Sequence, residues 1–135
     1  MTLKFFIDAC FIIYLNVLTD KEETKKLDDL LLKILSEELY IDLLVLDEAL
    51  YISKKKYNID YETTLNFIEE NIFPFTSIVP IEERDYKLMK EYIKKYNLKP
   101  SDAIHLAVMD KTGITTIVSE DEDFDKTHVK RLWVT

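Results

Sequence analysis

The sequence has one cysteine, one glycine and three prolines in 135 residues. With Cys10 alone, the chain can form neither an internal disulfide nor a cysteine-based structural zinc site, which favours a reducing, cytoplasmic setting. No apolar run reaches the length of a membrane span, and the chain starts on a strand-like segment without a basic leader, so we expect no membrane association. No linker or repeat divides the sequence, which predicts a single domain over residues 1–135.

Basic residues are also scarce, with 18 Lys and Arg against 26 Asp and Glu and a net charge of -8. Nonspecific nucleic-acid affinity comes from Lys and Arg that release counterions, so this charge argues against a general phosphate-binding surface. Two divalent cations in a carboxylate cluster would halve this net charge, and they would add their positive charge at the place where a phosphate would bind. The basic residues that could contact a phosphate backbone, for which an ordinary solvated surface is the favoured explanation, are Lys54, Lys55, Lys56, Lys94, Lys95, Lys99, Lys130 and Arg131.

The apolar residues alternate between two spacings along the chain. Short apolar runs predict buried strands at residues 3–7, 76–79, 114–119 and 129–134. Helical spacing predicts helices at residues 10–18, 22–39, 43–56, 61–72, 82–96 and 100–113, with a short extended piece at residues 40–41. Asp42 suits the N-cap of the third helix, and Gly113 suits the left-handed C-cap of the last. This alternation predicts an α/β fold with a central, mostly parallel sheet flanked by helices.

Acidic residues are so common that only their position can single them out. Asp8 ends the first predicted strand, Asp121 follows a later one, and Asp102 lies in the first turn of a helix. Ligands of open α/β sheets bind outside the carboxyl ends of the strands, so Asp8 and Asp121 can converge there.

Glu48 is unusual among the acids because apolar residues surround it at helical spacing: Leu44, Val45, Tyr51 and Ile52. We expect it to be mostly buried and to need a cation or a hydrogen-bond partner. Carboxylates brought together repel and raise one another's pKa unless a cation is present. Oxygen ligands select Mg²⁺, Mn²⁺ or Ca²⁺, and two such ions can activate water and stabilise the leaving oxygen in phosphodiester cleavage.

Each candidate also has a structural explanation. Asp102 can complement a helix dipole, Asp8 can cap the next helix, Glu48 can pair with a lysine, and residues 120–125 can form a solvated loop. His105 can orient Asp102 or contact RNA, but a satisfied, partly buried histidine is favoured because no second histidine accompanies it in a ligand arrangement. Neighbouring carboxylates argue against Cys10 as a nucleophile.

Four segments together resemble the PIN-domain family, especially its small prokaryotic branch of VapC-like toxins, over nearly the whole length. They are FFIDACFIIYL, LLVLDEALYISKKKY, LKPSDAIHLAVMDKTGI and TTIVSEDEDFD. The resemblance implies a PIN-like three-layer α/β/α fold and metal ligation by Asp8, Glu48, Asp102 and Asp121. It also implies Asp123 as a supporting or alternative ligand, with Glu120 close enough to compete.

The same resemblance implies a metal-dependent endoribonuclease that uses two Mg²⁺ or Mn²⁺ ions on an RNA substrate. It further implies a homodimer and, in the toxin branch, an antitoxin protein that occupies the active-site groove. Cys10 stands where a small polar residue is common, and Ser119 replaces a frequent Thr. Both departures change hydrogen bonding around the ligands rather than the number of ligands.

Three other functions also fit parts of this pattern. A PIN-like protein-binding module with weak or no catalysis would keep the fold without needing all four acids. A phosphoaspartate-forming phosphatase places a second Asp two residues after the first, where this chain has Cys10. A receiver-type switch needs a pair of acids after the first strand and a late Lys, whereas this chain has Asp8 alone and SEDED.

Overall fold

The computed structural model describes residues 2–17 and 21–134. Five parallel strands form one sheet with the order β3-β2-β1-β4-β5. The strands are β1 (Lys4–Ile7), β2 (Glu38–Ile41), β3 (Thr76–Ile78), β4 (Thr116–Val118) and β5 (Lys130–Leu132). In β1, Phe6 and Ile7 are buried because the central strand has neighbours on both edges and helices over both faces.

The helices connect successive strands. They are α1 (Ala9–Val17), α2 (Lys21–Ile34), α3 (Leu43–Tyr57), α4 (Tyr61–Phe67), α5 (Asp85–Tyr96) and α6 (Pro100–Thr112). Three short turns complete the described elements: the π-helical η1 (Ile68–Ile72) and the 3-10 helices η2 (Phe73–Phe75) and η3 (Glu122–Lys126). None of the helices in residues 2–17 and 21–134 is long and apolar enough to cross a membrane.

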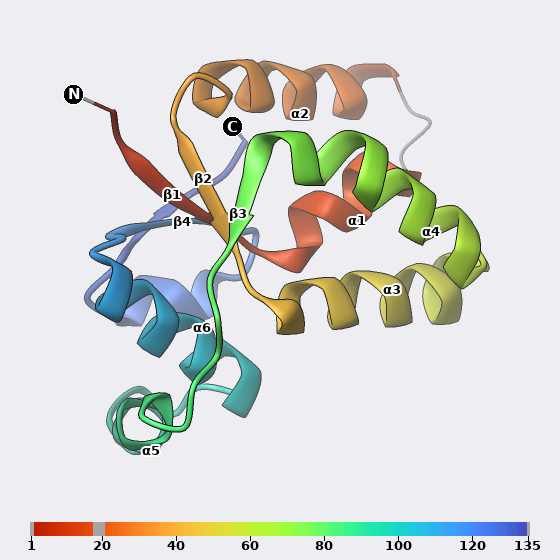
Figure 1. Cartoon of the computed structure of the whole chain (residues 1–135). Coiled ribbons are helices and arrows are strands. Elements are labelled where there is room, and N and C mark those ends of the chain that lie inside the picture. The colour runs from red at the N-terminus through yellow and green to blue at the C-terminus, as the bar shows by residue number, and fades with distance from the viewer. Residues whose placement is uncertain (1, 18–20, 135) are drawn as a thin grey trace.

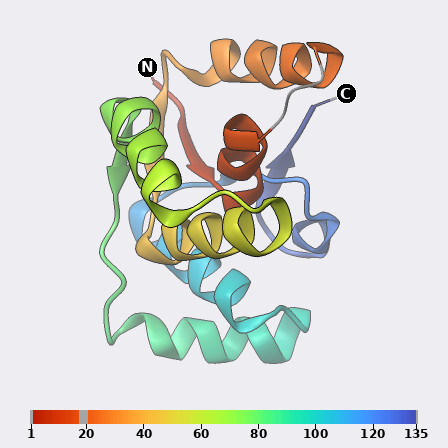
Figure 2. The same cartoon turned by 90° about the vertical axis from the view of Figure 1, so that its right-hand side faces the viewer.

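Helices lie on both sides of the sheet. Figures 1 and 2 place α2 on one side of the strands and the pair of α5 and α6 on the other. The first strand pairs with β2 from Lys4 opposite Glu38 and with β4 from Phe5 opposite Thr116. The predicted three-layer α/β/α architecture with a central parallel sheet is therefore confirmed.

The main error of the sequence-based prediction concerns β2. Helical spacing predicted a helix through residue 39 and an extended piece only at residues 40–41, but α2 ends at Ile34 and Glu38 already belongs to β2. The side chains of β2 alternate, with Leu39 and Ile41 buried. Pairing with β1 on one edge and β3 on the other overrides the helical preference of Glu and Leu in this segment.

The other boundaries shift by a few residues. The helix predicted over residues 82–96 begins at Asp85, because the Asp85 carboxylate accepts the backbone N–H of Glu82 at 2.8 Å and closes a turn before the helix. The helix predicted over residues 61–72 is divided between α4 and η1. Residue 18, the predicted end of the first helix, lies outside the described residues. The predicted caps are confirmed: Asp42 accepts the N–H of Val45 at 3.0 Å, and Gly113 adopts φ 72°.

Candidate metal site

The strand order reverses between β1 and β4. The chain extends the sheet from β1 through β2 to β3 and then crosses to β4 and β5 on the other side. Ligands of open α/β sheets bind at such a reversal, outside the carboxyl ends of the strands. Asp8 directly follows β1, and Ser119 directly follows β4. The N–H of Asp8 donates to the carbonyl of Val118 at 3.0 Å, which holds the two strand ends side by side.

Asp8 is buried and held by both of its carboxylate oxygens. Its Oδ1 accepts the backbone N–H of Ala9 at 2.8 Å, and its Oδ2 accepts the hydroxyl of Ser119 at 2.7 Å. The Ser119 oxygen in turn accepts the N–H of Asp121 at 3.0 Å. Ser119 therefore fixes the carboxylate after β1 and the loop after β4 relative to each other.

Asp102 enters the same place from the first turn of α6, where Pro100 starts the helix. Only 4% of Asp102 is exposed, and its Oδ2 has no hydrogen-bond partner among the described residues. The Lys99 Nζ lies 4.0 Å from that oxygen. Burial, with repulsion from Asp8, raises the pKa of Asp102 to about 7. A solvated helix-dipole residue would show neither the burial nor the raised pKa.

Glu48 reaches the site from α3 but is less buried than expected. Its side chain is partly exposed, and Tyr51, one of its apolar neighbours at helical spacing, is 49% exposed. The buried face of α3 is formed by Val45, Leu46, Ala49 and Ser53 instead. Burial and repulsion from Asp8 still raise the pKa of Glu48.

The carboxylates of Asp8, Glu48, Asp102 and Asp121 line one hollow of about 520 Å³, here called the acidic groove. The other residues that line it are Cys10, Ile13, Tyr14, Ile52, Lys56, Tyr57, Lys99, Glu120 and Glu122. The lining thus contains six acidic and two basic residues. Lys99 extends toward the carboxylates, with its Nζ 3.9 Å from Asp121 Oδ2. Converging oxygen donors fit a hard divalent cation, and one of them, Asp102 Oδ2, is buried without a hydrogen-bond partner within residues 2–17 and 21–134.

Asp123 lies apart from this cluster. It is exposed and is not among the residues that line the groove. Its backbone N–H donates to Asp121 Oδ1 at 2.9 Å, so Asp123 supports the conformation of the loop, and its carboxylate lies 3.9 Å from Lys126. The acids of this loop that line the groove are Glu120, Asp121 and Glu122.

The sequence did not indicate how closely two further residues are connected to the site. His105, expected to be partly buried, is fully buried and lies beside Asp8 and Asp102. Asp42, identified only as a helix cap, also accepts a hydrogen bond from the His105 ring at 2.8 Å. The spacing of His105 one turn after Asp102 indicated a shared helix face, but nothing in the sequence joined it to Asp42.

Cys10 faces the groove as a thiol. Burial and the charge of Asp8 raise its pKa to about 12, which agrees with its low expected reactivity.

We predict that iodoacetamide modifies Cys10 at mildly alkaline pH, with EDTA present, about 100-fold more slowly in the folded protein than in urea. A raised pKa leaves less of the reactive thiolate at any given pH. Because Cys10 is partly accessible, poor access of the reagent cannot by itself explain the slower modification. Mass spectrometry measures the two rates of modification, and equal rates in the folded and the unfolded protein would contradict a raised pKa for Cys10.

Comparison with known proteins adds a family and a fold. The sequence model of the PIN-domain family matches residues 5–130 of this chain. No curated protein matches the sequence.

Several solved structures share the fold at low sequence identity. The VapC20 toxin of Mycobacterium tuberculosis, described as cleaving the Sarcin-Ricin loop, superimposes with a TM-score of 0.71 at 17% identity, covering 90% of this chain and 92% of that one. VapBC2 of Rickettsia felis, bound to a promoter DNA fragment, superimposes with a TM-score of 0.74 at 13% identity, covering 98% of this chain and 100% of that one. DNA-bound VapBC of Salmonella typhimurium gives 0.72 at 15% identity with 98% coverage of each chain.

Proposed function

Because the chain belongs to the PIN-domain family, we propose that it is a metal-dependent endoribonuclease that hydrolyses RNA phosphodiester bonds in the acidic groove. The observation that carries the proposal is the convergence of Asp8, Glu48, Asp102 and Asp121 on one groove at the reversal of the strand order. Asp102 adds a buried carboxylate oxygen that has no hydrogen-bond partner among the described residues.

The ligands that we propose for two Mg²⁺ or Mn²⁺ ions are Asp8, Glu48, Asp102 and Asp121. Ions bound there would activate the attacking water and neutralise charge on the leaving oxygen. Ser119 and the N–H of Ala9 hold the Asp8 carboxylate in one orientation. Burial raises the pKa of Asp102 to about 7, and a cation held there would favour the ionised carboxylate. Asp123, which is outside the groove lining, stays a proposed supporting or alternative ligand, and its backbone N–H donates to Asp121 Oδ1.

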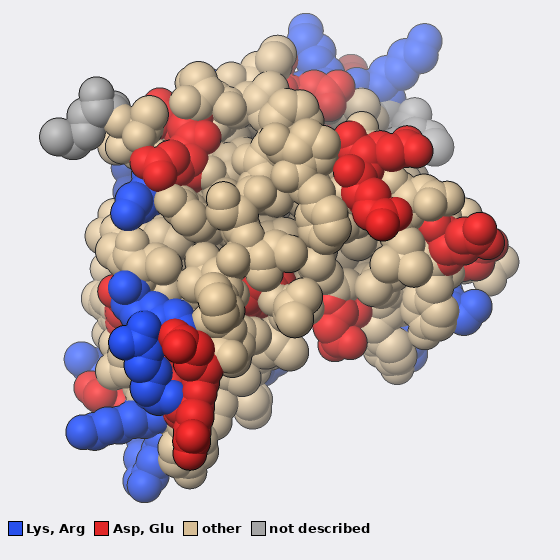
Figure 3. Space-filling model, in the orientation of Figure 1, with Lys and Arg blue, Asp and Glu red and all other residues tan. Residues whose placement is uncertain are grey.

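Lys99 is the basic residue best placed to hold the RNA backbone. Its side chain is 64% exposed and its Nζ lies about 4 Å from both Asp102 and Asp121, at the edge of the carboxylate cluster. Lys56 also lines the groove, whereas Lys94 and Lys95 lie at the end of α5. Figure 3 shows that Lys and Arg gather over the region of α5 beside a row of acidic side chains, so this surface carries both signs of charge.

We predict that Lys99→Gln weakens RNA binding, because one phosphate contact is lost. The slope of log affinity against log salt should fall by about one, as expected for the loss of one counterion-releasing contact. Affinity for Mn²⁺ should not fall, since the lysine competes with a cation for Asp102 and Asp121. Fluorescence anisotropy with a labelled RNA and titration calorimetry measure the two quantities.

The matched control for Lys99→Gln is Lys87→Gln, which removes the same charge from an exposed position on α5. The control should leave the salt slope unchanged. Equal slopes for both variants would show that Lys99 makes no phosphate contact.

We also propose that the chain is the toxin of a toxin-antitoxin pair. The support is the likeness in fold to VapBC assemblies, together with a groove whose acids outnumber its lysines and therefore attract a basic segment. An antitoxin that places such a segment in the groove would block RNA. A homodimer and a cytoplasmic location remain predictions.

The function is tested by incubating the purified protein with mixed tRNA and single-stranded RNA in Mn²⁺, Mg²⁺ or EDTA. Cleavage in either metal, and none in EDTA, is the expected result. Binding of Mn²⁺ without cleavage of any RNA would favour the protein-binding module instead, and cleavage that persists in EDTA would contradict the proposed chemistry.

A further inference from the structure

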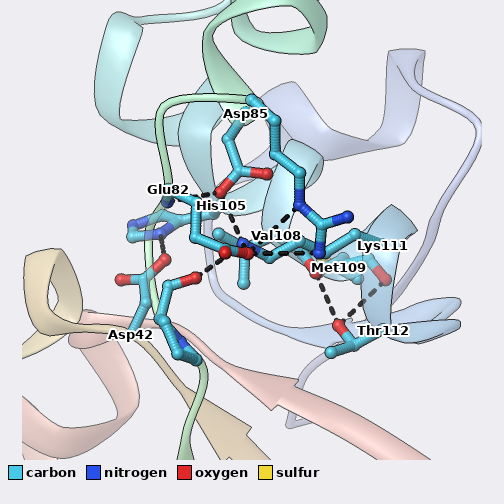
Figure 4. A network of polar contacts seen from close by, with 10 residues as sticks. Asp42, Glu82, Asp85, His105, Val108, Met109, Lys111 and Thr112 are labelled. Carbon is cyan, nitrogen blue, oxygen red and sulfur yellow. Dashed lines mark hydrogen bonds and ion pairs between the residues drawn. The ribbon is translucent and has the colours of Figure 1, made fainter.

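A buried histidine lies next to the carboxylates of the acidic groove, and in the part of the chain that the structure describes only one of its ring nitrogens is hydrogen-bonded. His105 is fully buried on α6, one turn after Asp102. Its Nδ1 lies 2.8 Å from Asp42 Oδ2 (Figure 4). Asp42 is itself fully buried and is fixed by the N–H of Val45, which donates to its other oxygen at 3.0 Å. The beginning of α3 therefore holds the imidazole ring in one orientation.

The other ring nitrogen is directed toward the carboxylates. The Nε2 of His105 lies 4.0 Å from Asp8 Oδ1 and has no hydrogen-bond partner among the described residues. Asp102 Oδ2 is also buried without such a partner. One donor atom from each of Asp8, Asp102 and His105 lies within 4.8 Å of the other two. Two ligands on opposite sides of a cation, each bonded at about 2.1 Å, are about 4.2 Å apart, so small side-chain movements bring this set to bonding distance.

We propose that His105 is a nitrogen ligand of one of the cations, which makes the site a mixed nitrogen and oxygen centre. The inference rests on the proposed metal site and adds a ligand of a different chemical class. A metal-binding histidine almost always donates its second ring N–H to a carboxylate or a carbonyl, and Asp42 stands in that position. With the proton on Nδ1, the lone pair of Nε2 is free for a cation. Ligation would also satisfy both atoms that lack a hydrogen bond.

The nitrogen ligand changes which cation the site prefers. Imidazole binds first-row transition ions better than Mg²⁺, which prefers carboxylate, carbonyl and water oxygens. The centre should therefore bind Mn²⁺ in preference to Mg²⁺. The competing account is structural: a doubly protonated His105 between Asp42 and Asp8 would fill the same space without touching a cation.

Pulsed electron paramagnetic resonance of the Mn²⁺-loaded protein separates these accounts without measuring cleavage. Nitrogen bonded to Mn²⁺ modulates the spin echo, and heavy-nitrogen labelling of histidine alone changes that modulation. The chain has two histidines. The second, His128, is engaged at 2.9 Å by Tyr96 and by Asp110, so His128→Gln is the matched control.

We expect histidine-nitrogen modulation in the wild type and in His128→Gln. His105→Gln should abolish it and weaken Mn²⁺ binding on the order of tenfold or more by calorimetry, with a smaller loss for Mg²⁺. If His105→Gln does not fold, the labelled wild type and His128→Gln still decide the question. Mn²⁺ bound without nitrogen modulation would overturn the ligand while leaving the proposed function intact. Failure to bind Mn²⁺ at all would overturn both.

Discussion

Asp102→Asn is expected to reduce the rate of metal-dependent RNA cleavage by at least about 100-fold. The substitution keeps the size of the side chain but removes the charge that a divalent cation requires from this buried position. Because Asp102 Oδ2 has no hydrogen-bond partner among the described residues, the amide that replaces it breaks no hydrogen bond that the structure shows and removes only the charge interaction with Lys99, whose Nζ lies 4.0 Å away. The folded state should therefore persist, and the measurement is single-turnover cleavage of a labelled RNA in saturating Mn²⁺.

Asp47→Asn is the matched control for this variant. It makes the same chemical change at an exposed position of α3, one residue before Glu48. Its cleavage rate should stay near that of the wild type. If Asp102→Asn retained full activity, or if both variants lost it equally, the assignment of Asp102 as a ligand would be wrong.

Lys111→Met is expected to lower the free energy of unfolding by about 3 kcal/mol. The Lys111 Nζ donates to Asp85 Oδ2 at 2.6 Å, to Glu82 Oε1 at 2.9 Å and to the carbonyl of Pro80 at 2.6 Å (Figure 4). The Asp85 carboxylate is almost fully buried, so removing the lysine leaves an uncompensated charge between α5 and α6. Urea unfolding followed by circular dichroism measures the difference.

Two further variants identify the cause of that loss. Lys87→Met makes the same substitution at an exposed position of α5 and should change stability by less than about 0.5 kcal/mol. Asp85→Asn combined with Lys111→Met removes both charges and should recover part of the lost stability. A loss for Lys111→Met no larger than that of Lys87→Met would show that the ion pair does not stabilise the fold.

The positions of the main carboxylates could be predicted because they depend on local signals. A short apolar run followed by Asp8, and Pro100 two residues before Asp102, each place an acid at the end of an element. The parallel topology then brings Asp8 and Asp121 to one edge of the sheet. Chain order and element ends were therefore sufficient for this part of the site.

The features that were missed depend on contacts between distant segments. Leu39 belongs to a strand only because β1 and β3 pair with it on either side. The contact of Asp42 with His105 joins residues 63 positions apart in the chain. The exposure of Glu48 depends on which face of α3 packs inward: Val45, Leu46, Ala49 and Ser53 form the buried face, and Glu48 lies at the edge of that face. None of these can be derived from spacing along one segment.

The central claim is hydrolysis of RNA by water in a metal-dependent groove, and the ends of the cleavage products test it most directly. The cleavage should be run in Mn²⁺ in water labelled with heavy oxygen, and the products analysed by mass spectrometry. We predict linear phosphate ends that carry one heavy oxygen from the solvent, and no products in EDTA. Cyclic phosphate ends without the label, formed equally in EDTA, would show attack by the RNA's own 2′-hydroxyl and would contradict the account.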